Sequence, residues 1–408
     1  MTADAEDHLD SAYSWRRLAV SILIATIGNV GMWAVVVVLP AVQAEFAVER
    51  GEASVPFSFS MVGFAIGNVL IGRYVDRLGI ALPLAAAAVA NGIGFVLAGF
   101  SGNIWLFALA QGLLIGIGSA ANFAPLMADI SHWFARRRGL AMAAAASGNY
   151  IAGAVWPPLM QPFLAEFGWR ATYVGIGVFV LATAVPLTLL LRRPRPEFAD
   201  EGPAGSPNAL KPTTLSPRAL QGLLIVAGLG CCVAMSMPQV HIVAYCVDLG
   251  YGVARGAEML SLMLAGGIVS RILSGYVADR IGGVRTLLIG SVLQGLSLVF
   301  YIPFDGLASL YIVSLMFGLA QGGIVPCYAI IVREYFPARE AGQRTGIVIM
   351  ATIAGMAIGG WMSGWIYDMT GSYQAAFLNG IAWNLLNLSA MLVVLFRTGR
   401  RAEAAAAA

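Results

Sequence analysis

The sequence predicts an all-α membrane protein whose twelve transmembrane helices form two six-helix bundles related by pseudo-symmetry. Three observations predict this fold class. The chain is 59% hydrophobic and only 11% charged, whereas a soluble domain carries about 25% charged residues. Long apolar runs follow one another along its whole length, and one short loop sequence occurs in both halves.

Each apolar run is long enough for a membrane-spanning helix, which needs about 20 apolar residues. Only helices or closed barrels satisfy the backbone without water, and these runs are too long and too uniformly apolar for barrel strands. We expect spans at residues 18–42, 55–74, 81–100, 104–130, 139–163 and 172–191, then at 220–246, 257–277, 286–304, 307–332, 342–367 and 375–396.

These spans divide the chain into an N-terminal bundle over 1–191, a linker over 192–218, a C-terminal bundle over 219–397 and a tail over 398–408. The linker is polar and rich in Pro, Gly and Ser, which is typical of a segment without a core of its own. Twelve spans need no partner chain to enclose a path, so we expect a monomer.

The arginines predict the orientation. Placing both termini in the cytoplasm puts nearly all Lys and Arg on the cytoplasmic side, as the positive-inside rule requires. The exceptions are Arg50, Arg170 and Arg255, and Arg271 lies within a helix. The net charge of +3 therefore marks topology and indicates no nucleic-acid partner. The acidic N-terminus is not a signal peptide, and we expect a multi-pass protein of a cell membrane, the bacterial inner membrane.

The repeated loop sequence indicates two homologous halves. Residues 72–79 (GRYVDRLG) recur as 275–282 (GYVADRIG), which places Asp76 and Asp279 203 positions apart. Duplicated helical bundles are typical of secondary transporters. Gly168 matches Gly371 at the same spacing. Prolines also recur in corresponding spans, Pro40 with Pro238 and Pro125 with Pro326, and they predict matching bends.

Other chemistry finds little support in the sequence. Cys231, Cys232, Cys246 and Cys327 lack metal-ligand or redox spacing and are expected to be packing residues. The glycines of 112–118 favour close contact between helices. No Walker loop, dinucleotide fingerprint or set of catalytic groups occurs, so we expect neither a cofactor nor an enzyme.

The chain resembles the major facilitator superfamily over essentially its whole length. The loop signature of that superfamily, Gly-x-x-x-Asp-Arg-x-Gly-x-x-Arg, is complete from Gly275 to Arg285, whereas the first copy ends in Leu82. A narrower resemblance is to the monocarboxylate and oxalate/formate transporters. It rests on Asn122-x-x-Pro125, on residues 132–141 (HWFARRRGLA) and on Arg271 before the second loop. The resemblance implies transport of a small organic anion by alternating access.

Arg271 is the strongest candidate for binding that anion. It lies about 9 Å inside the expected cytoplasmic edge, counting 1.5 Å per residue. An arginine at the centre of a membrane helix costs about 2.5–3.5 kcal/mol. Its planar fork fits a carboxylate. Four residues earlier stands Gly267, not an acid, so we expect the substrate to supply the opposite charge. Snorkelling of the side chain to the inner surface is the alternative.

His241 is a second candidate, because a buried histidine can bind substrate or titrate near neutral pH. A histidine that satisfies a free backbone carbonyl is equally compatible with the sequence. Further polar and aromatic residues in the spans are expected to complete the pocket, although each could instead serve helix packing: Asn29, Trp33, Asn122, Asn149, Tyr150, Tyr328 and Trp361.

The repeated loops predict a gate. Asp76 and Asp279 lie at cytoplasmic helix ends, where a carboxylate can meet a neighbouring helix N-terminus. With Arg77, Arg280 and Arg285 they are expected to latch one transport state; the alternative is a static topology anchor.

Energy coupling remains open at this level. The proton-linked monocarboxylate transporters carry a lysine in the first span and an aspartate at the position of Gly267, and this chain has neither. Its other acids near spans, Asp129, Asp248, Glu258 and Asp368, are expected to be peripheral. Proton symport through His241 or the bound acid, uniport, and anion exchange all stay possible. Proton-driven export of drugs or metabolites and a non-transporting sensor are the rival functions.

Overall fold

A computed structural model describes residues 9–134, 137–193 and 213–406, and every regular element in this part of the chain is helical. The predicted all-α class is therefore confirmed for it. Most of the predicted linker falls at 194–212, outside the described residues. The predicted tail is helical as far as Ala406, because the last helix continues through it.

The first half contains both long and short helices. Ser11 begins the first of them, since its hydroxyl accepts a hydrogen bond from the Ser14 N–H at 3.2 Å. The helices are α2 (Ala12–Gly28), α3 (Val30–Phe46), α4 (Arg50–Leu78), α5 (Ala81–Gly99), α6 (Ile104–Ala110), a π-helical stretch (Gln111–Gly116), α7 (Ile117–Ala120), α8 (Ala124–Ser131), α9 (Arg138–Ala146) and α10 (Gly148–Thr188), which ends in a 3₁₀ turn (Leu189–Leu191).

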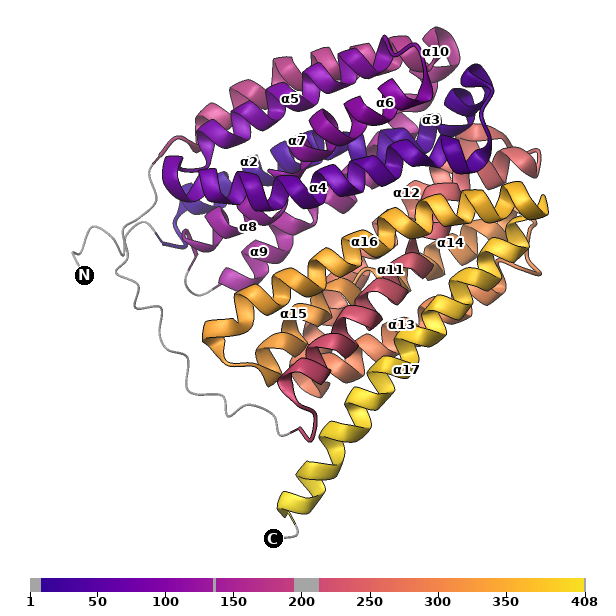
Figure 1. Ribbon diagram of the computed structural model, residues 1–408. Helices are drawn as coiled ribbons and strands as arrows, with labels where there is room; N and C mark the ends of the chain where they lie inside the picture. The colour runs from indigo at the N-terminus through magenta and orange to yellow at the C-terminus, as the bar shows by residue number, and fades with distance from the viewer. Residues whose placement is uncertain (1–8, 135–136, 194–212, 407–408) are drawn as a thin grey trace. The chain divides into compact units, whose positions relative to one another are not determined.

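The second half is built from seven helices in the described residues: α11 (Pro217–Asp248), α12 (Gly252–Ile281), α13 (Gly283–Phe300), α14 (Leu307–Gln321), α15 (Ile324–Tyr335), α16 (Ala338–Thr370) and α17 (Tyr373–Ala406). α13 packs against α14, α15 and α17, and α16 contacts α15 and α17. In the first half α10 packs along α5 and also contacts α2 and α3 (Figure 1).

The chain forms two compact units. One comprises Met1–Glu201 with Val243–Ser261, and the other comprises Gly202–Ile242 with Leu262–Ala408. The segment Val243–Ser261 is held to the first unit by an ion pair, in which Arg50 NH2 lies 3.1 Å from Asp248 Oδ1. Asp248 is therefore paired and not simply peripheral.

Eleven helical segments of the described residues are long and apolar enough to cross a membrane. Two of the twelve predicted spans, 139–163 and 172–191, fall in one segment, Leu140–Leu191. Its backbone leaves the helical conformation at Gly168, where φ is 74° and ψ is 172°. A positive φ strains residues with a side chain, so glycine belongs at this turn.

The duplication predicted from the loops extends to backbone and contacts. Gly79 and Gly282, 203 positions apart, both have positive φ, 75° and 86°. Interior contacts repeat as well. The Asn91 side chain donates to the Gly28 carbonyl at 2.7 Å, and 203 positions later the Gln294 side chain donates to the Cys231 carbonyl at 3.2 Å. The two halves therefore share hydrogen bonds as well as motifs.

Four of the expected spans are interrupted within the described residues. The first breaks at Asn29, the fourth at residues 121–123, the fifth at Ser147 and the tenth at residues 322–323. Pro125 and Pro326 lie in the first turn after their breaks, where proline removes no helical hydrogen bond, as the matching prolines predicted. Pro40 differs, because it lies inside α3 and the first span breaks eleven residues earlier.

Glycines allow the close helix contacts that the sequence predicted. A Cβ atom on Gly63 of α4 would lie 1.9 Å from the Gly112 carbonyl oxygen, and one on Gly116 would lie 2.5 Å from the Ser60 oxygen. The four cysteines are free and buried, as expected of packing residues.

We expect Gly63→Ala to lower the free energy of unfolding by about 1–3 kcal/mol, because the new methyl group forces the α4 backbone away from Gly112. Gly72→Ala is the matched control on the same helix, since a Cβ there has no atom within 4 Å. Thermal unfolding of the purified protein in detergent measures both. Equal melting temperatures for the two variants would contradict the close approach.

Candidate functional site

In the first unit the predicted site residues gather around the break at Asn29. Asn29, Trp33, Asn122 and Tyr150 are all buried. The Asn122 amide packs directly on Gly28, where an added Cβ would lie 2.2 Å from Asn122 Nδ2. The structure therefore brings Asn29 and Asn122 to one level of the unit.

Side-chain amides satisfy the backbone at this break. Asn29 Nδ2 donates to the Ala25 carbonyl at 2.8 Å. The Gly28 carbonyl accepts from Asn91 Nδ2 at 2.7 Å and from the Ser119 hydroxyl at 3.0 Å. Four polar side chains from three spans thus gather at Gly28. We call them the Gly28 layer (Asn29, Asn91, Ser119, Asn122).

Tyr150 lies at the start of α10, and Trp33 of α3 contacts the same end of that helix. The Trp33 indole N–H is 3.0 Å from the Asn149 carbonyl and 3.1 Å from its side-chain oxygen. Gly148 lets α10 approach α2, because a Cβ there would lie 2.4 Å from the Ala25 Cβ. Trp33 therefore contacts Asn149, which precedes Tyr150 in the chain.

Arg271 lies beside the break in the tenth span. It is half-buried, and its Nε is 3.4 Å from the Gly322 carbonyl. Its neighbour Ser270 accepts a hydrogen bond from the Gly323 N–H at 3.2 Å. Two consecutive residues of α12 thus contact the two residues between α14 and α15, which orients the guanidinium from its Nε side.

His241 is fully buried and links three helices of the second unit. Its Nε2 is 2.8 Å from the Gly360 carbonyl in α16, and its Nδ1 is 3.2 Å from the Tyr373 hydroxyl in α17. A carbonyl can only accept, so Nε2 carries the proton and a neutral ring accepts from Tyr373 at Nδ1. These contacts match the carbonyl-satisfying alternative for this histidine.

The two remaining candidates of the second unit lie in different environments. Tyr328 is buried and donates to Asn387 Oδ1 at 3.2 Å, while Asn387 Nδ2 donates to the Ser291 hydroxyl at 2.7 Å. Trp361 is 43% exposed and its ring lies 6.2 Å from that of Trp365, with the rings 20° from parallel. The structure therefore does not bring Tyr328 and Trp361 together.

The predicted gating residues lie at exposed helix ends. Arg280 donates to the Tyr276 hydroxyl and stacks on its ring at 4.1 Å, and Arg77, Asp279 and Arg285 are exposed. The side chain of Asp76 lies outside the described residues. A carboxylate does meet the N-terminus of α13, but it belongs to Glu334, whose Oε1 accepts from the Gly283 N–H at 3.1 Å.

A buried ion pair was not expected. Arg17 Nε donates to Asp129 Oδ2 at 2.9 Å and NH2 donates to Oδ1 at 3.1 Å, with both residues at most 2% exposed. The Trp133 ring covers the guanidinium at 4.5 Å. The expectation that Asp129 is peripheral was wrong, because its partner lies 112 residues away in sequence and both charges are enclosed. An acid and an arginine near the same ends of neighbouring spans were the available signal.

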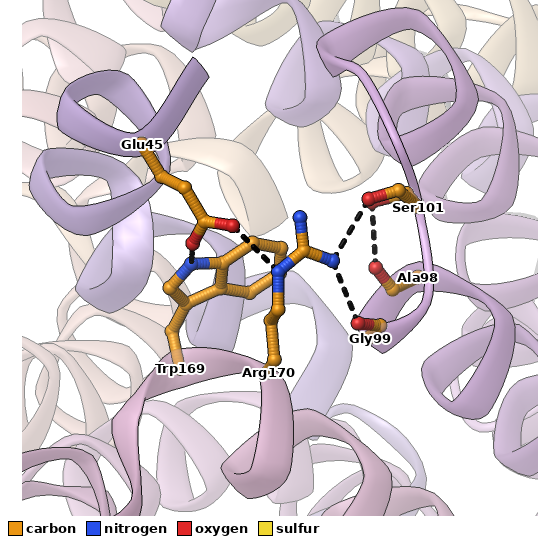
Figure 2. Close-up of polar contacts among 6 residues, drawn as sticks. All are labelled: Glu45, Ala98, Gly99, Ser101, Trp169 and Arg170. Atoms are coloured by element: carbon orange, nitrogen blue, oxygen red, sulfur yellow. Dashed lines mark hydrogen bonds and ion pairs between the residues drawn. The ribbon is translucent and has the colours of Figure 1, made fainter. Parts of the chain in front are cut away.

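A second charged cluster ties the opposite end of the first span to two others (Figure 2). Glu45 of α3 accepts from the Trp169 indole and from Arg170 Nε, the latter at 2.6 Å. The same guanidinium donates to the carbonyls of Gly99 at 2.9 Å and Ser101 at 2.8 Å. Arg170 thus satisfies carbonyls at the end of α5, which have no partners within their own helix.

Long apolar helices, polar interior layers at helix breaks and a duplicated pair of halves define a multi-pass membrane protein of the secondary-transporter class. The family model of the Major Facilitator Superfamily matches the sequence over residues 21–307 and 257–408. The chain belongs to this superfamily of transporters and is not an enzyme.

Individual relatives agree on the class and differ in their stated roles. Monocarboxylate transporter 13 of Bos taurus is 28% identical over 349 residues, covering 84% of this chain and 79% of the relative. An agnestins efflux protein of Paecilomyces divaricatus is 28% identical over 366 residues, covering 87% and 80%. The crystal structure of a mutant nucleoside transporter NupG has a TM-score of 0.72 at 14% identity, covering 92% of this chain and 99% of that one.

We expect Asp129→Asn to destabilise the protein by about 3–5 kcal/mol, because it leaves Arg17 charged and buried without its partner. The double variant Arg17→Met/Asp129→Leu should lose much less, since neither charge remains. Thermal unfolding of both purified variants tests this, with Glu258→Gln as a control in the exposed Arg255–Glu258 pair. A double variant as unstable as Asp129→Asn would be the contrary result.

Proposed function

We propose that this protein transports a small, monocarboxylate-like organic anion across the membrane by alternating access. The single observation that carries the proposal is Arg271, a half-buried arginine in a membrane-spanning helix, held by its Nε against the Gly322 carbonyl. The planar guanidinium fork fits a carboxylate, which it can bind through two parallel hydrogen bonds. The cost of keeping this charge in the membrane is then offset when an anion binds.

The proposal uses a twelve-helix topology. A helix needs about 20 residues to cross the bilayer, and Leu140–Leu191 has 52 with a turn at Gly168, so we count it as two crossings. Both termini are then on one side, the cytoplasm, with bundles at 1–191 and 219–397 joined by the linker. We propose a monomer in the bacterial inner membrane, because the arginine distribution and the two complete bundles favour it.

The remaining pocket residues follow from the first unit. Trp33 donates to Asn149, the chain neighbour of Tyr150, and Asn122 packs on Gly28. Within this unit they would supply hydrogen bonds and apolar surface for a small organic acid. Tyr328 contributes only if Asn387 releases it, and Trp361 only from an exposed helix face.

Proton coupling through His241 would reverse one existing hydrogen bond. Protonation makes both ring nitrogens donors, so Nδ1 would donate to the Tyr373 hydroxyl instead of accepting from it. A proton carried by the bound acid itself leaves these contacts unchanged.

Metabolite export is the second candidate function, and the efflux protein among the relatives supports it. It shares the fold and the family, so direction of transport separates it from uptake. A sensor that keeps the fold would bind its ligand without flux.

We expect Arg271→Ala to abolish the thermal stabilisation that small carboxylates give the purified protein, since ligand stabilises the form that binds it. Arg271→Lys keeps the charge but loses the fork, and should weaken affinity about tenfold or more. Arg255→Ala, an exposed arginine, is the control. A carboxylate shift that survives in Arg271→Ala would remove the anion proposal.

The loop residues Asp76, Arg77, Asp279, Arg280 and Arg285 are proposed as a latch for one transport state. We expect Asp279→Asn to change the rate of uptake into proteoliposomes more than it changes the amount of protein in the membrane. Asp305→Asn, at the far end of α13, is the control. Parallel losses of rate and membrane content would favour a static anchor.

A further inference from the structure

The Gly28 layer contains two buried amide oxygens that accept no hydrogen bond from the described residues. They are Oδ1 of Asn29 and Oδ1 of Asn91, and both side chains are 0% exposed. Their identity as oxygens is fixed by the other end of each amide, because both Nδ2 groups donate to carbonyls, those of Ala25 and Gly28. Buried acceptors without a donor are costly, so their presence at one break calls for a ligand.

The duplicated half shows that this arrangement is particular to the first unit. Gln294 stands 203 positions after Asn91 and makes the same donation, to Cys231, which stands 203 positions after Gly28. There the amide oxygen is satisfied, because the Cys231 thiol donates to it at 3.9 Å. In the first unit the matching residue is glycine, which has no such group, and the position of Asn29 is taken by Cys232.

The chemistry of the layer selects the class of ligand. Every side chain in it is neutral, and the unsatisfied atoms are all oxygens, so the ligand must be a donor or a cation. Hard oxygen ligands suit hard cations, but divalent ions take carboxylates in most sites. Asp129, a buried carboxylate of the first unit, is already paired with Arg17. Neither oxygen has surface open to solvent, which favours an ion smaller than water.

We propose that the Gly28 layer binds a sodium ion, held by the side-chain oxygens of Asn29 and Asn91 and completed by oxygens of Ser119 and Asn122. The Asn122 amide lies against Gly28, where its Oδ1 would be 2.7 Å from an added Cβ, and the Ser119 hydroxyl is 3.0 Å from the Gly28 carbonyl. Broken membrane helices are a recurrent place for sodium in secondary transporters.

Sodium bound at this layer would also couple transport of the anion to a sodium gradient. This part of the inference rests on the proposed anion transport, with the substrate carried as a carboxylate that brings no proton of its own. One bound sodium ion balances the charge of one monocarboxylate, so the loaded transporter would cross between states without a change in net charge.

Thermal unfolding of the full-length protein in detergent tests the site, with NaCl, KCl or choline chloride at equal ionic strength and no organic anion. We expect stabilisation that saturates with sodium and is absent with choline. Asn91→Leu and Asn29→Leu should weaken the apparent sodium affinity at least about tenfold. Gln294→Leu is the matched control, because it removes the corresponding amide of the other half, and should leave the sodium response intact.

Identical unfolding in all three salts would overturn the proposal and leave a buried water as the partner of the two oxygens. Equal loss in Gln294→Leu would show a packing effect. Should the asparagine variants fail to fold, equilibrium binding of radioactive sodium to the wild-type protein decides, with no binding as the contrary result. Sodium binding without carboxylate binding would defeat only the anion proposal, and uptake of the anion indifferent to a sodium gradient would defeat only the coupling.

Discussion

The requirement that buried backbone groups find partners without water governs this structure. In a membrane, an interrupted helix exposes carbonyl and amide groups that lipid cannot satisfy. Two of the breaks are met by side chains of neighbouring spans: Asn91 and Ser119 at Gly28, and Ser270 and Arg271 at residues 322–323. The positions of the polar residues therefore follow from the breaks. The residues that satisfy a break are also the ones available to a ligand there.

The two halves share backbone geometry and some hydrogen bonds, and they differ in the polar residues at matched positions. The glycines at 79 and 282 and the amides at 91 and 294 keep the same geometry in both halves. Replacement of glycine by cysteine at the matched position 231 satisfies one amide and leaves the other without a donor. Arg271 arises in the same way, since the matching residue of the first half is Asn68, which donates to its own helix at the Phe64 carbonyl.

The sequence was sufficient for the all-α membrane class, because composition and the length of the apolar runs can be read locally along the chain. It also identified the neighbourhood of Asn29, Trp33, Asn122 and Tyr150, since polar residues inside spans are few. Ion pairs between distant segments could not be predicted from the sequence in this way. Asp129 needs Arg17, and Glu45 needs Arg170, and no local pattern links residues more than a hundred positions apart. His241 was ambiguous for the same reason, because its partners Gly360 and Tyr373 come from other helices.

The first span shows how these constraints combine. One end is fixed by the buried Arg17–Asp129 pair, and the other by the contact of Glu45 with Trp169 and Arg170. Between them Asn29 leaves the helical conformation, with φ of −92° and ψ of 6°. The buried Arg17–Asp129 pair is costly to separate, and Trp169 and Arg170 contact the other end. Bending of this span is therefore expected at the interruption between them. The Gly28 layer is thus the part of this span where occupation by a ligand has the greatest influence on its shape.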